Sequence, residues 1–218
     1  MDNNKYIALN FFSSKIKIKV IGAGKGAAIK AKTFCTNGCT IEVLSKDFSE
    51  EILKLKDYNI KYIKGSYHKD FLVSGHIVLI AIDDKELCKT IIKDCEDLNK
   101  IYIDSTEFKN GMGVIPSQRN LNNLSFSVST KVGVPKISKL LGDKIESSLK
   151  EYDEFTLYIS KLRKRAKNEK LKKEIIDFIC TEDFKFFYDM NKDKIVFKMF
   201  FEESITNSIY SIYAKDIN

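Results

Sequence analysis

Residues 16–45 contain an apolar segment, a glycine-rich turn, a stretch of small residues and a second apolar segment. This order constrains the fold of the chain more than any other feature. The first apolar segment, 16–21, leads into Gly22-Ala23-Gly24-Lys25-Gly26-Ala27. Gly22, Gly24 and Ala27 fit the Gly-x-Gly-x-x-Gly/Ala pattern of dinucleotide-binding β-α-β units. The pattern predicts a strand, a tight turn, a helix to about Gly38 and a second strand over 40–45.

Each small residue of this turn has a specific part in such a unit. Gly22 permits the tight turn, Gly24 lets the backbone approach a pyrophosphate, and Ala27 lets helix and strand pack closely. The free N–H groups and the dipole at the start of the helix favour an anion. We therefore expect the backbone of Gly22, Ala23, Gly24, Lys25 and Gly26 to bind a dinucleotide. A tight turn without a ligand is the alternative.

The end of the second strand departs from the usual pattern. An Asp or Glu about 20 residues past the glycines commonly binds the adenosine ribose, but this chain has Leu44-Ser45-Lys46-Asp47 there. Ser45, Lys46 and Asp47 are the candidates for this contact. Lys46 could accept a 2′-phosphate, so NADP stays open, and NAD is the favoured cofactor.

The segments that follow alternate between strand and helix patterns. Strands are predicted at 60–63, 77–81 and 101–103, and helices at 49–55 and 85–98, the latter capped by Asp83 or Asp84. The continuous apolar run 77–81 is typical of a strand that is buried on both faces of a parallel sheet. The alternation predicts an α/β fold, a Rossmann-like doubly wound parallel sheet.

The pattern changes after about residue 112. Strands are expected at 114–115 and 124–129, and a helix is expected to begin near Pro135, because proline is tolerated in a first helical turn. The remainder predicts several helices with an aromatic cluster, formed by Phe184, Phe186, Phe187, Phe197, Phe200 and Phe201. Its default role is packing in the helical core, and a stripe of it left exposed would be a subunit interface. We expect a nucleotide-binding domain over 1–112, a small β-containing dimerisation segment over 113–150 and a helical C-terminal domain over 151–218.

The charge of the chain is concentrated in its first part. The net charge is +7, and residues 1–142 supply all of it, with 22 Lys and Arg against 15 Asp and Glu. A basic nucleotide-binding part suits an anionic cofactor and an anionic substrate. The lysines are scattered and accompany no nucleic-acid-binding motif, so we expect no nucleic-acid partner.

The cysteines and the hydropathy pattern bear on metal binding and location. The five cysteines form no Cys-x-x-Cys pair and only two histidines accompany them, so no metal site is predicted and reduced thiols are expected. No long apolar stretch resembles a membrane span or a signal peptide. These features predict a cytoplasmic protein without a membrane partner.

The motifs together resemble those of one family, the N-terminal module of siroheme synthases. This family comprises precorrin-2 dehydrogenases, some of which double as sirohydrochlorin ferrochelatases. The resemblance covers roughly residues 6–150. The matching elements are Gly22-Ala23-Gly24-Lys25-Gly26-Ala27 with Lys30, Ala81-Ile82-Asp83-Asp84, Ile101-Tyr102-Ile103-Asp104, Pro116-Ser117, Ser129-Thr130-Lys131-Val132-Gly133-Val134-Pro135, and 140–146.

The resemblance implies a reaction and its site. The substrate would be precorrin-2, an anionic tetrapyrrole that is oxidised to sirohydrochlorin with NAD. Asp104 would act as the general base, or as a ligand that delivers Fe²⁺ if the protein is also a chelatase, and a turn cap is its structural alternative. Asp83 would lie in the cofactor site, and Ser129, Thr130 and Lys131 would line the substrate cleft. Members of the family form homodimers.

Three departures from the family pattern leave alternatives open. Lys131-Val132 replaces a Gly-Gly pair, Ile29 replaces an arginine, and Cys88 replaces an asparagine. The alternatives are a sirohydrochlorin ferrochelatase, alone or bifunctional, for which Fe²⁺ or Co²⁺ would be a substrate, and a non-catalytic sensor of NAD or a tetrapyrrole. The pathway, siroheme or cobalamin, is open as well.

Overall fold

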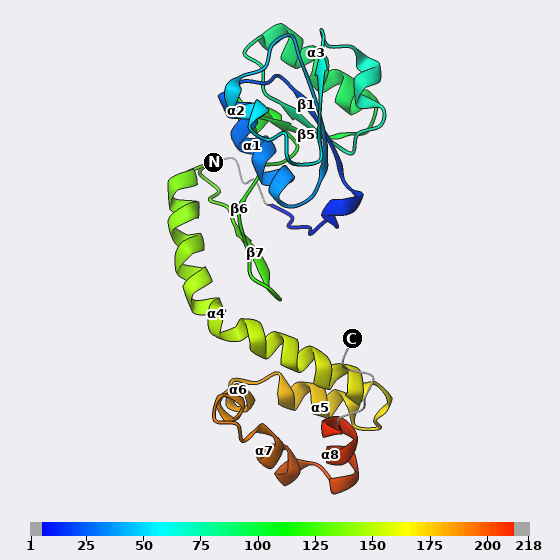
Figure 1. Cartoon of the computed structure of the whole chain (residues 1–218), viewed down its shortest axis with the longest axis vertical. Helices are drawn as coiled ribbons and strands as arrows, with labels where there is room; N and C mark the ends of the chain where they lie inside the picture. The colour runs from blue at the N-terminus through cyan, green and yellow to red at the C-terminus, as the bar shows by residue number, and fades with distance from the viewer. Residues whose placement is uncertain (1–5, 212–218) are drawn as a thin grey trace. The chain divides into compact units, whose positions relative to one another are not determined.

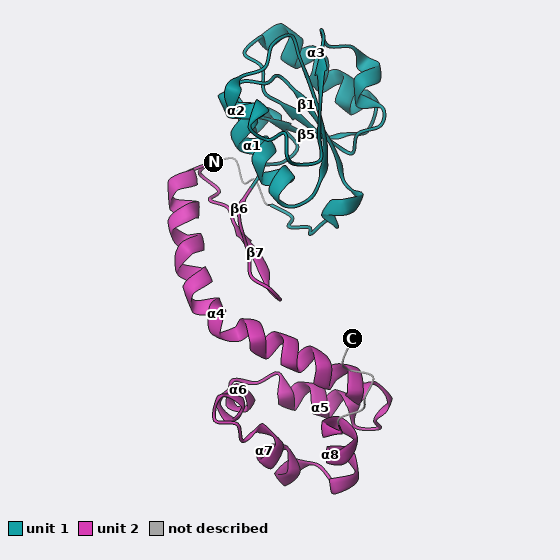
Figure 2. Ribbon diagram, viewed as in Figure 1, with its two compact units in different colours: residues 1–115 teal, residues 116–218 magenta. Residues whose placement is uncertain are grey.

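The computed structural model describes residues 6–211, and the chain divides into two compact units, residues 1–115 and 116–218 (Figure 2). The division predicted from the sequence, with boundaries after residues 112 and 150, stays a prediction. Helix α4 (Pro135–Arg165) runs without a break through residue 150.

The first unit is built on a parallel five-stranded sheet (Figure 1). Its order is β3-β2-β1-β4-β5, so the chain reverses its direction of winding between β1 and β4. The strands are β1 (Lys17–Ile21), β2 (Thr40–Ser45), β3 (Ile60–Lys64), β4 (Ile77–Ile80) and β5 (Ile101–Asp104). The predicted Rossmann-like sheet is confirmed. Ligands of such sheets bind at the carboxyl ends of the strands, where the winding reverses.

Short helices connect the strands. They are η1 (Ser13–Lys15), α1 (Lys25–Thr36), α2 (Glu50–Leu53), η2 (Lys69–Leu72), α3 (Lys85–Asp97) and η3 (Phe108–Asn110). Asp84 begins α3, because its Oδ1 accepts hydrogen bonds from the backbone N–H groups of Glu86 and Leu87. Ser49 caps α2 in the same way.

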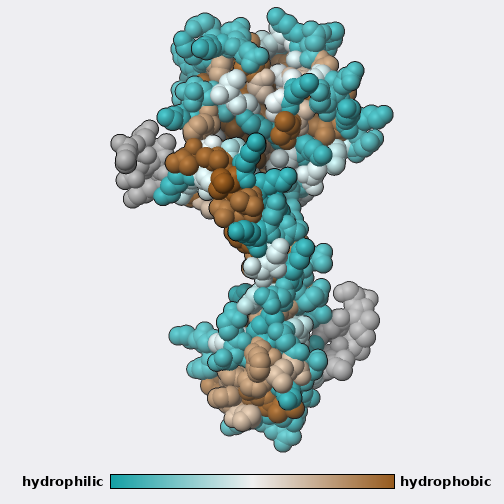
Figure 3. Space-filling model, turned by 90° about the vertical axis from the view of Figure 1, so that its left-hand side faces the viewer, coloured by the Kyte–Doolittle hydropathy of each residue, from teal (hydrophilic) through white to brown (hydrophobic). Residues whose placement is uncertain are grey.

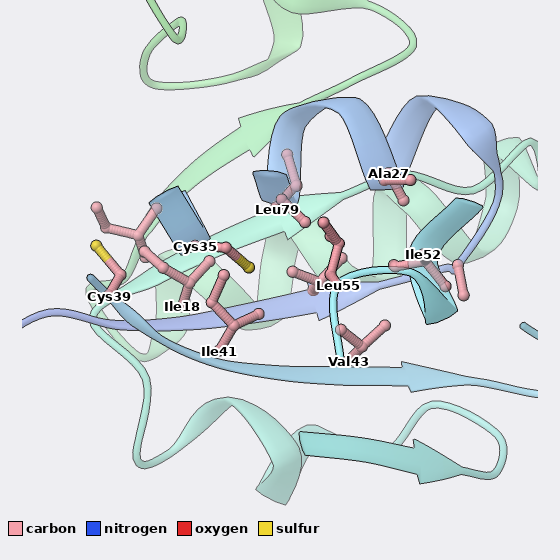
Figure 4. Packing of buried hydrophobic residues seen from close by; sticks show 14 of the residues in the cluster. Ile18, Ala27, Cys35, Cys39, Ile41, Val43, Ile52, Leu55 and Leu79 are labelled. Atoms are coloured by element: carbon pink, nitrogen blue, oxygen red, sulfur yellow. The ribbon is translucent and has the colours of Figure 1, made fainter. Parts of the chain in front are cut away.

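Two apolar layers cover the faces of this sheet. On one face, Ala27 and Cys35 of α1 and Ile52 of α2 pack against Ile41 and Leu79 of the strands (Figure 4). The other layer joins α3 to the sheet and contains the buried residues Ile21, Leu44, Phe71, Leu72, Val78, Ile80, Cys88, Ile91, Cys95 and Tyr102. The cysteines of the two helices thus serve as small core residues.

The second unit consists of a hairpin, one long helix and a cluster of short helices. Strands β6 (Ser117–Asn120) and β7 (Ser125–Val128) pair antiparallel. Helix α4 begins at Pro135, as predicted. The following elements are η4 (Ala166–Asn168), α5 (Lys172–Ile179), α6 (Glu182–Asp189), α7 (Asp193–Phe200) and α8 (Glu203–Tyr210). Their core contains Leu162, Ile175, Phe184 and Phe197.

Polar contacts at two points hold the hairpin against α4. Arg119 on β6 donates to Asp143 at 2.5 Å and lies 3.3 Å from Glu146. The buried carboxylate of Asp153 accepts hydrogen bonds from the backbone N–H groups of Asn122 and Asn123 at the hairpin turn. The hairpin is therefore fixed to the helix along β6 and at its turn.

Two expectations about this part of the chain are wrong. The strand predicted at 114–115 begins instead at Ser117, because hairpin pairing matches Ser117–Asn120 residue by residue with Ser125–Val128. Ile115 packs against the core of the first unit instead. Phe186 and Phe200, which were expected in the helical core, are 59% and 66% exposed.

Each helix within residues 6–211 is too short or too polar to cross a membrane.

Candidate cofactor and acid–base site

The glycine turn lies where three parallel strands end. The N–H of Gly22 donates to the carbonyl oxygen of Leu44 at the end of β2, at 3.0 Å. The N–H of Ala81 donates to Ile21 at 2.8 Å, and the N–H of Ser49 donates to Ala23 at 3.1 Å. These bonds fix the turn at the carboxyl edge of the sheet, between β1, β2 and β4.

The glycines of the turn differ in what surrounds them. Gly22 has φ +94° and a Cβ placed there would lie 2.8 Å from the carbonyl carbon of Ala81, so no other residue fits without a shift. Gly24 has φ −75°, and a Cβ on Gly24 or Gly26 would meet no atom within 4 Å. Gly22 is therefore required by the fold, whereas Gly24 and Gly26 border open space.

This open space lies at the N-terminus of α1, and its chemistry suits a phosphate. Gly24 caps the helix without a side-chain hydrogen bond, and the first turn contains no acidic residue. The first N–H groups of a helix have no partner within the helix and point toward an approaching anion. The backbone at Gly24, Lys25 and Gly26 thus fits the pyrophosphate of a dinucleotide.

The other predicted cofactor residues lie around the same edge. Ser45 ends β2 and is half-buried, while Lys46 and Asp47 beside it are exposed. The carboxylate of Asp47 lies 3.6 Å from the ammonium of Lys64, in an exposed ion pair. Asp83 is exposed between β4 and the capping residue of α3. Of this set, Ser45 is the last residue of β2 and Asp83 lies three residues after the end of β4, and all of them remain candidates.

Asp104 ends β5 and is only 2% exposed. Its Oδ1 accepts bonds from the N–H of Thr106 at 2.8 Å, from the hydroxyl of Thr106 at 2.8 Å and from the N–H of Glu107 at 3.0 Å. Its Oδ2 lies 3.5 Å from the thiol of Cys88 and 3.4 Å from the side-chain nitrogen of Asn110. The carboxylate therefore organises the turn that follows the strand.

These contacts set the charge of Asp104. Burial opposes its ionisation, but the bonds from Glu107 and Thr106 outweigh burial, so the pKa of this carboxyl lies below its ordinary value. Asp104 is consequently a carboxylate near neutral pH, and both of its oxygens act as hydrogen-bond acceptors. Burial and the charge of Asp104 raise the pKa of the Cys88 thiol to about 11, so Cys88 stays protonated and can donate.

Two neighbours of this carboxylate, Cys88 and Lys30, were not among the predicted site residues. Cys88 was noted only as a departure from the family pattern, and Lys30 only as a retained residue. Lys30 donates from α1 to the carbonyl oxygen of Ser105, the residue after Asp104, at 2.9 Å. No spacing in the sequence relates Lys30 to residues 75 positions away, so only the fold brings them together.

The predicted substrate residues belong to the second unit. They form the segment between β7 and α4, where Ser129 and Lys131 are exposed. The hydroxyl of Thr130 accepts a hydrogen bond from the N–H of Val134 at 2.7 Å and thereby closes a tight turn. Gly133 has φ +69° in this turn, a conformation that favours glycine.

Within residues 6–211, no three His, Cys, Asp or Glu side chains gather closely enough to hold a metal ion.

Comparison with protein families gives one match, to a model described as "Putative NAD(P)-binding", over residues 9–117. Two curated relatives extend the similarity beyond this region. The "Putative precorrin-2 dehydrogenase" of Methanocaldococcus jannaschii is 29% identical over 176 residues, which are 74% of this chain and 85% of the relative. The "Precorrin-2 dehydrogenase" of Bacillus subtilis is 23% identical over 141 residues, 64% of this chain and 86% of the relative.

The fold has a solved counterpart. The structure titled "SirC, precorrin-2 dehydrogenase" matches with a TM-score of 0.67 and covers 89% of this chain and 98% of its own. At 18% sequence identity, the match shows that the two chains share the fold, including the helical part beyond the family model.

Proposed function

Because the chain belongs to the NAD(P)-binding family of the siroheme-synthase N-terminal module, we propose that it oxidises precorrin-2 to sirohydrochlorin with NAD. The observation that carries this proposal is the open space beside Gly24 and Gly26 at the start of α1. It gives a dinucleotide a place at the carboxyl edge of the sheet, within a chain whose relatives are named for this reaction.

The reaction removes two electrons and two hydrogens from the tetrapyrrole. The nicotinamide of NAD, when bound, accepts one hydrogen as hydride. The other leaves as a proton, for which the chain must provide an acceptor. Asp104 is the proposed acceptor, because it is an ionised carboxylate at the end of β5. Its Oδ2 is bonded more weakly than Oδ1 and is the oxygen we assign to proton transfer.

The substrate carries several carboxylates, and the chain offers cations and donors for them. We assign Ser129, Thr130 and Lys131 to substrate binding. Lys131 supplies a charge that pairs with a carboxylate, and Ser129 supplies an exposed hydroxyl. The hydroxyl of Thr130 still has a hydrogen to donate while it accepts from Val134.

We further propose that the protein is a homodimer formed through the first half of α4. Apolar side chains are exposed there and just before it: Val132, Val134, Ile137, Leu140, Leu141 and Ile145. Figure 3 shows the face of the molecule that carries this half of the helix, with apolar side chains at its surface. Burial against a second copy would remove this surface from water.

The test is an assay of the purified protein with precorrin-2 and NAD. The proposal expects sirohydrochlorin to form, detected by its absorbance, in proportion to the NADH produced. Replacing NAD with NADP measures the cofactor preference. NAD binding without any turnover would identify a sensor, and metal insertion into sirohydrochlorin without NAD would identify a chelatase.

A further inference from the structure

Lys30 connects the helix of the cofactor cradle to the turn that carries Asp104. It lies four residues after Gly26, one helical turn further along α1. Its side chain is half-buried, and Nζ donates to the carbonyl oxygen of Ser105 at 2.9 Å. A lysine that loses part of its hydration needs such a partner, because an ammonium buried without one is costly.

Asp104 is held from both faces of the sheet. Lys30 reaches its turn from the face covered by α1, and Cys88 reaches its Oδ2 from the face covered by α3. Thr106 and Glu107 close the turn around Oδ1. Lys30 is therefore the contact through which α1 fixes the main chain beyond β5.

The positive charge of Lys30, like its hydrogen bond to Ser105, links α1 to the turn that carries Asp104. Burial lowers the pKa of Lys30, and the negative charge of Asp104 opposes that change. The negative charge of Asp104 thus favours the ionised form of Lys30 in a partly desolvated place. Loss of Lys30 would remove both the anchor at Ser105 and a positive charge near the carboxylate.

We propose that Lys30 is a positioning residue for the dehydrogenation. It fixes the turn after β5, so that Asp104 keeps one orientation relative to the helix that binds the cofactor. The proposal rests on the proposed function for its kinetic consequence. The geometric part, that Lys30 orders residues 104–110, does not depend on turnover.

The test compares three variants of the full chain. Lys30→Met removes the bond and the charge, Lys30→Arg keeps a cation of similar reach, and Lys32→Met removes an exposed charge from the same helix as the control. Each variant is measured for NAD affinity, for kcat and KM with precorrin-2, and for amide hydrogen exchange of residues 101–113.

Lys30→Met should lower kcat at least about tenfold, because a misplaced acid–base group loses much of its effect. The KM for precorrin-2 and the NAD affinity should stay within about twofold of the parent, since Lys30 touches neither ligand in this proposal. Exchange at Thr106 and Glu107 should become faster. Lys30→Arg should recover most of kcat, and Lys32→Met should match the parent.

Other outcomes would overturn the proposal. Unchanged exchange in Lys30→Met would show that Lys30 does not order the turn, whatever the activity. Loss of NAD affinity or a raised KM at unchanged kcat would make Lys30 a binding residue instead. A parent protein with ordered exchange but no turnover would refute the proposed function and leave the exchange comparison to decide the role of Lys30.

Discussion

A Cβ atom on Gly22 would lie 2.8 Å from the carbonyl carbon of Ala81 and 2.9 Å from Cγ2 of Ile82. These distances are shorter than side-chain atoms keep from a neighbouring backbone, and φ of Gly22 is +94°. Gly24, two residues later, has an ordinary φ and open space around its Cβ position. The fold therefore requires a glycine at position 22, whereas a glycine at position 24 matters only for a cofactor that approaches it.

Gly22→Ala should destabilise the protein. The positive φ and the overlap with Ala81 together cost about 2–3 kcal/mol of unfolding free energy. Urea unfolding of the parent and the variant, followed by circular dichroism, measures the loss. A variant as stable as the parent would mean that the turn adapts to a side chain.

Gly24→Val should keep the fold and lose the cofactor. Its side chain enters open space, so the unfolding free energy should change by less than about 1 kcal/mol. The same side chain occupies the place assigned to the pyrophosphate, so the Kd for NAD should rise at least about tenfold. Calorimetric titration with NAD measures this, and an unchanged Kd in the folded variant would remove the dinucleotide from this turn.

Two variants of Asp104 distinguish a proton acceptor from a turn cap. Asp104→Ala leaves the N–H groups of Thr106 and Glu107 without their acceptor and should cost about 2 kcal/mol of stability. Asp104→Asn keeps an oxygen for these bonds, so it should be nearly as stable as the parent. Both should lower turnover about a hundredfold or more, because neither can accept the proton.

The measurement for this pair is kcat at saturating NAD together with urea unfolding. If Asp104→Asn retains turnover within about threefold of the parent, the carboxylate is only a cap. If both variants lose stability equally, the cap requires the charge.

The buried thiols predict a loss of stability in alkali. Burial raises the pKa of Cys35 and Cys88 to about 11 and that of Cys95 to about 12, from an ordinary value of 9.0. As the pH rises from about 9 to the pKa of each folded-state thiol, that thiol loses its proton in the unfolded chain but keeps it in the folded chain. The unfolding free energy should therefore fall above about pH 9, by up to about 1.4 kcal/mol per pH unit for each such thiol.

Urea unfolding at about pH 8 and about pH 10 measures this slope. Cys95→Ala is the matched variant, because it removes one of the three thiols and should unfold with a shallower dependence on pH. If the unfolding free energy falls equally with pH in the variant and the parent, titratable groups other than Cys95 cause the loss of stability.

If the protein is a dimer through α4, its mass in solution should change when an apolar residue of α4 is replaced. The parent should sediment as a dimer across a concentration series, and Leu140→Glu should sediment as a monomer, because a charge on an apolar interface is costly to bury. Lys139→Glu, next to it on the helix, controls for the added negative charge. A monomeric parent at all concentrations would contradict the proposal.

The sequence predicted most of the first unit because its determinants are local. Apolar runs ended by glycine or aspartate placed the strands, and the pair Asp83-Asp84 placed the start of α3, since capping depends on residues two and three positions away. The strand expected at 114–115 was misplaced because its position depends on hairpin pairing with Ser125–Val128. Strand register of this kind is set by a partner and not by the strand's own composition.

The sequence by itself determined the Gly22–Ala27 turn and the parallel sheet, because both follow from backbone geometry or from short-range periodicity, whereas the resemblance to a family made Asp104 a candidate. Only the tertiary structure decided that Asp104 is buried, that Cys88 and Asn110 share its second oxygen, and that Lys30 holds the next residue. The contacts of Cys88 and Lys30 join α3 and α1 to the end of β5. They exist only because the crossing order of the strands brings α1 and α3 to opposite faces of β5, and that order depends on the packing of the whole sheet.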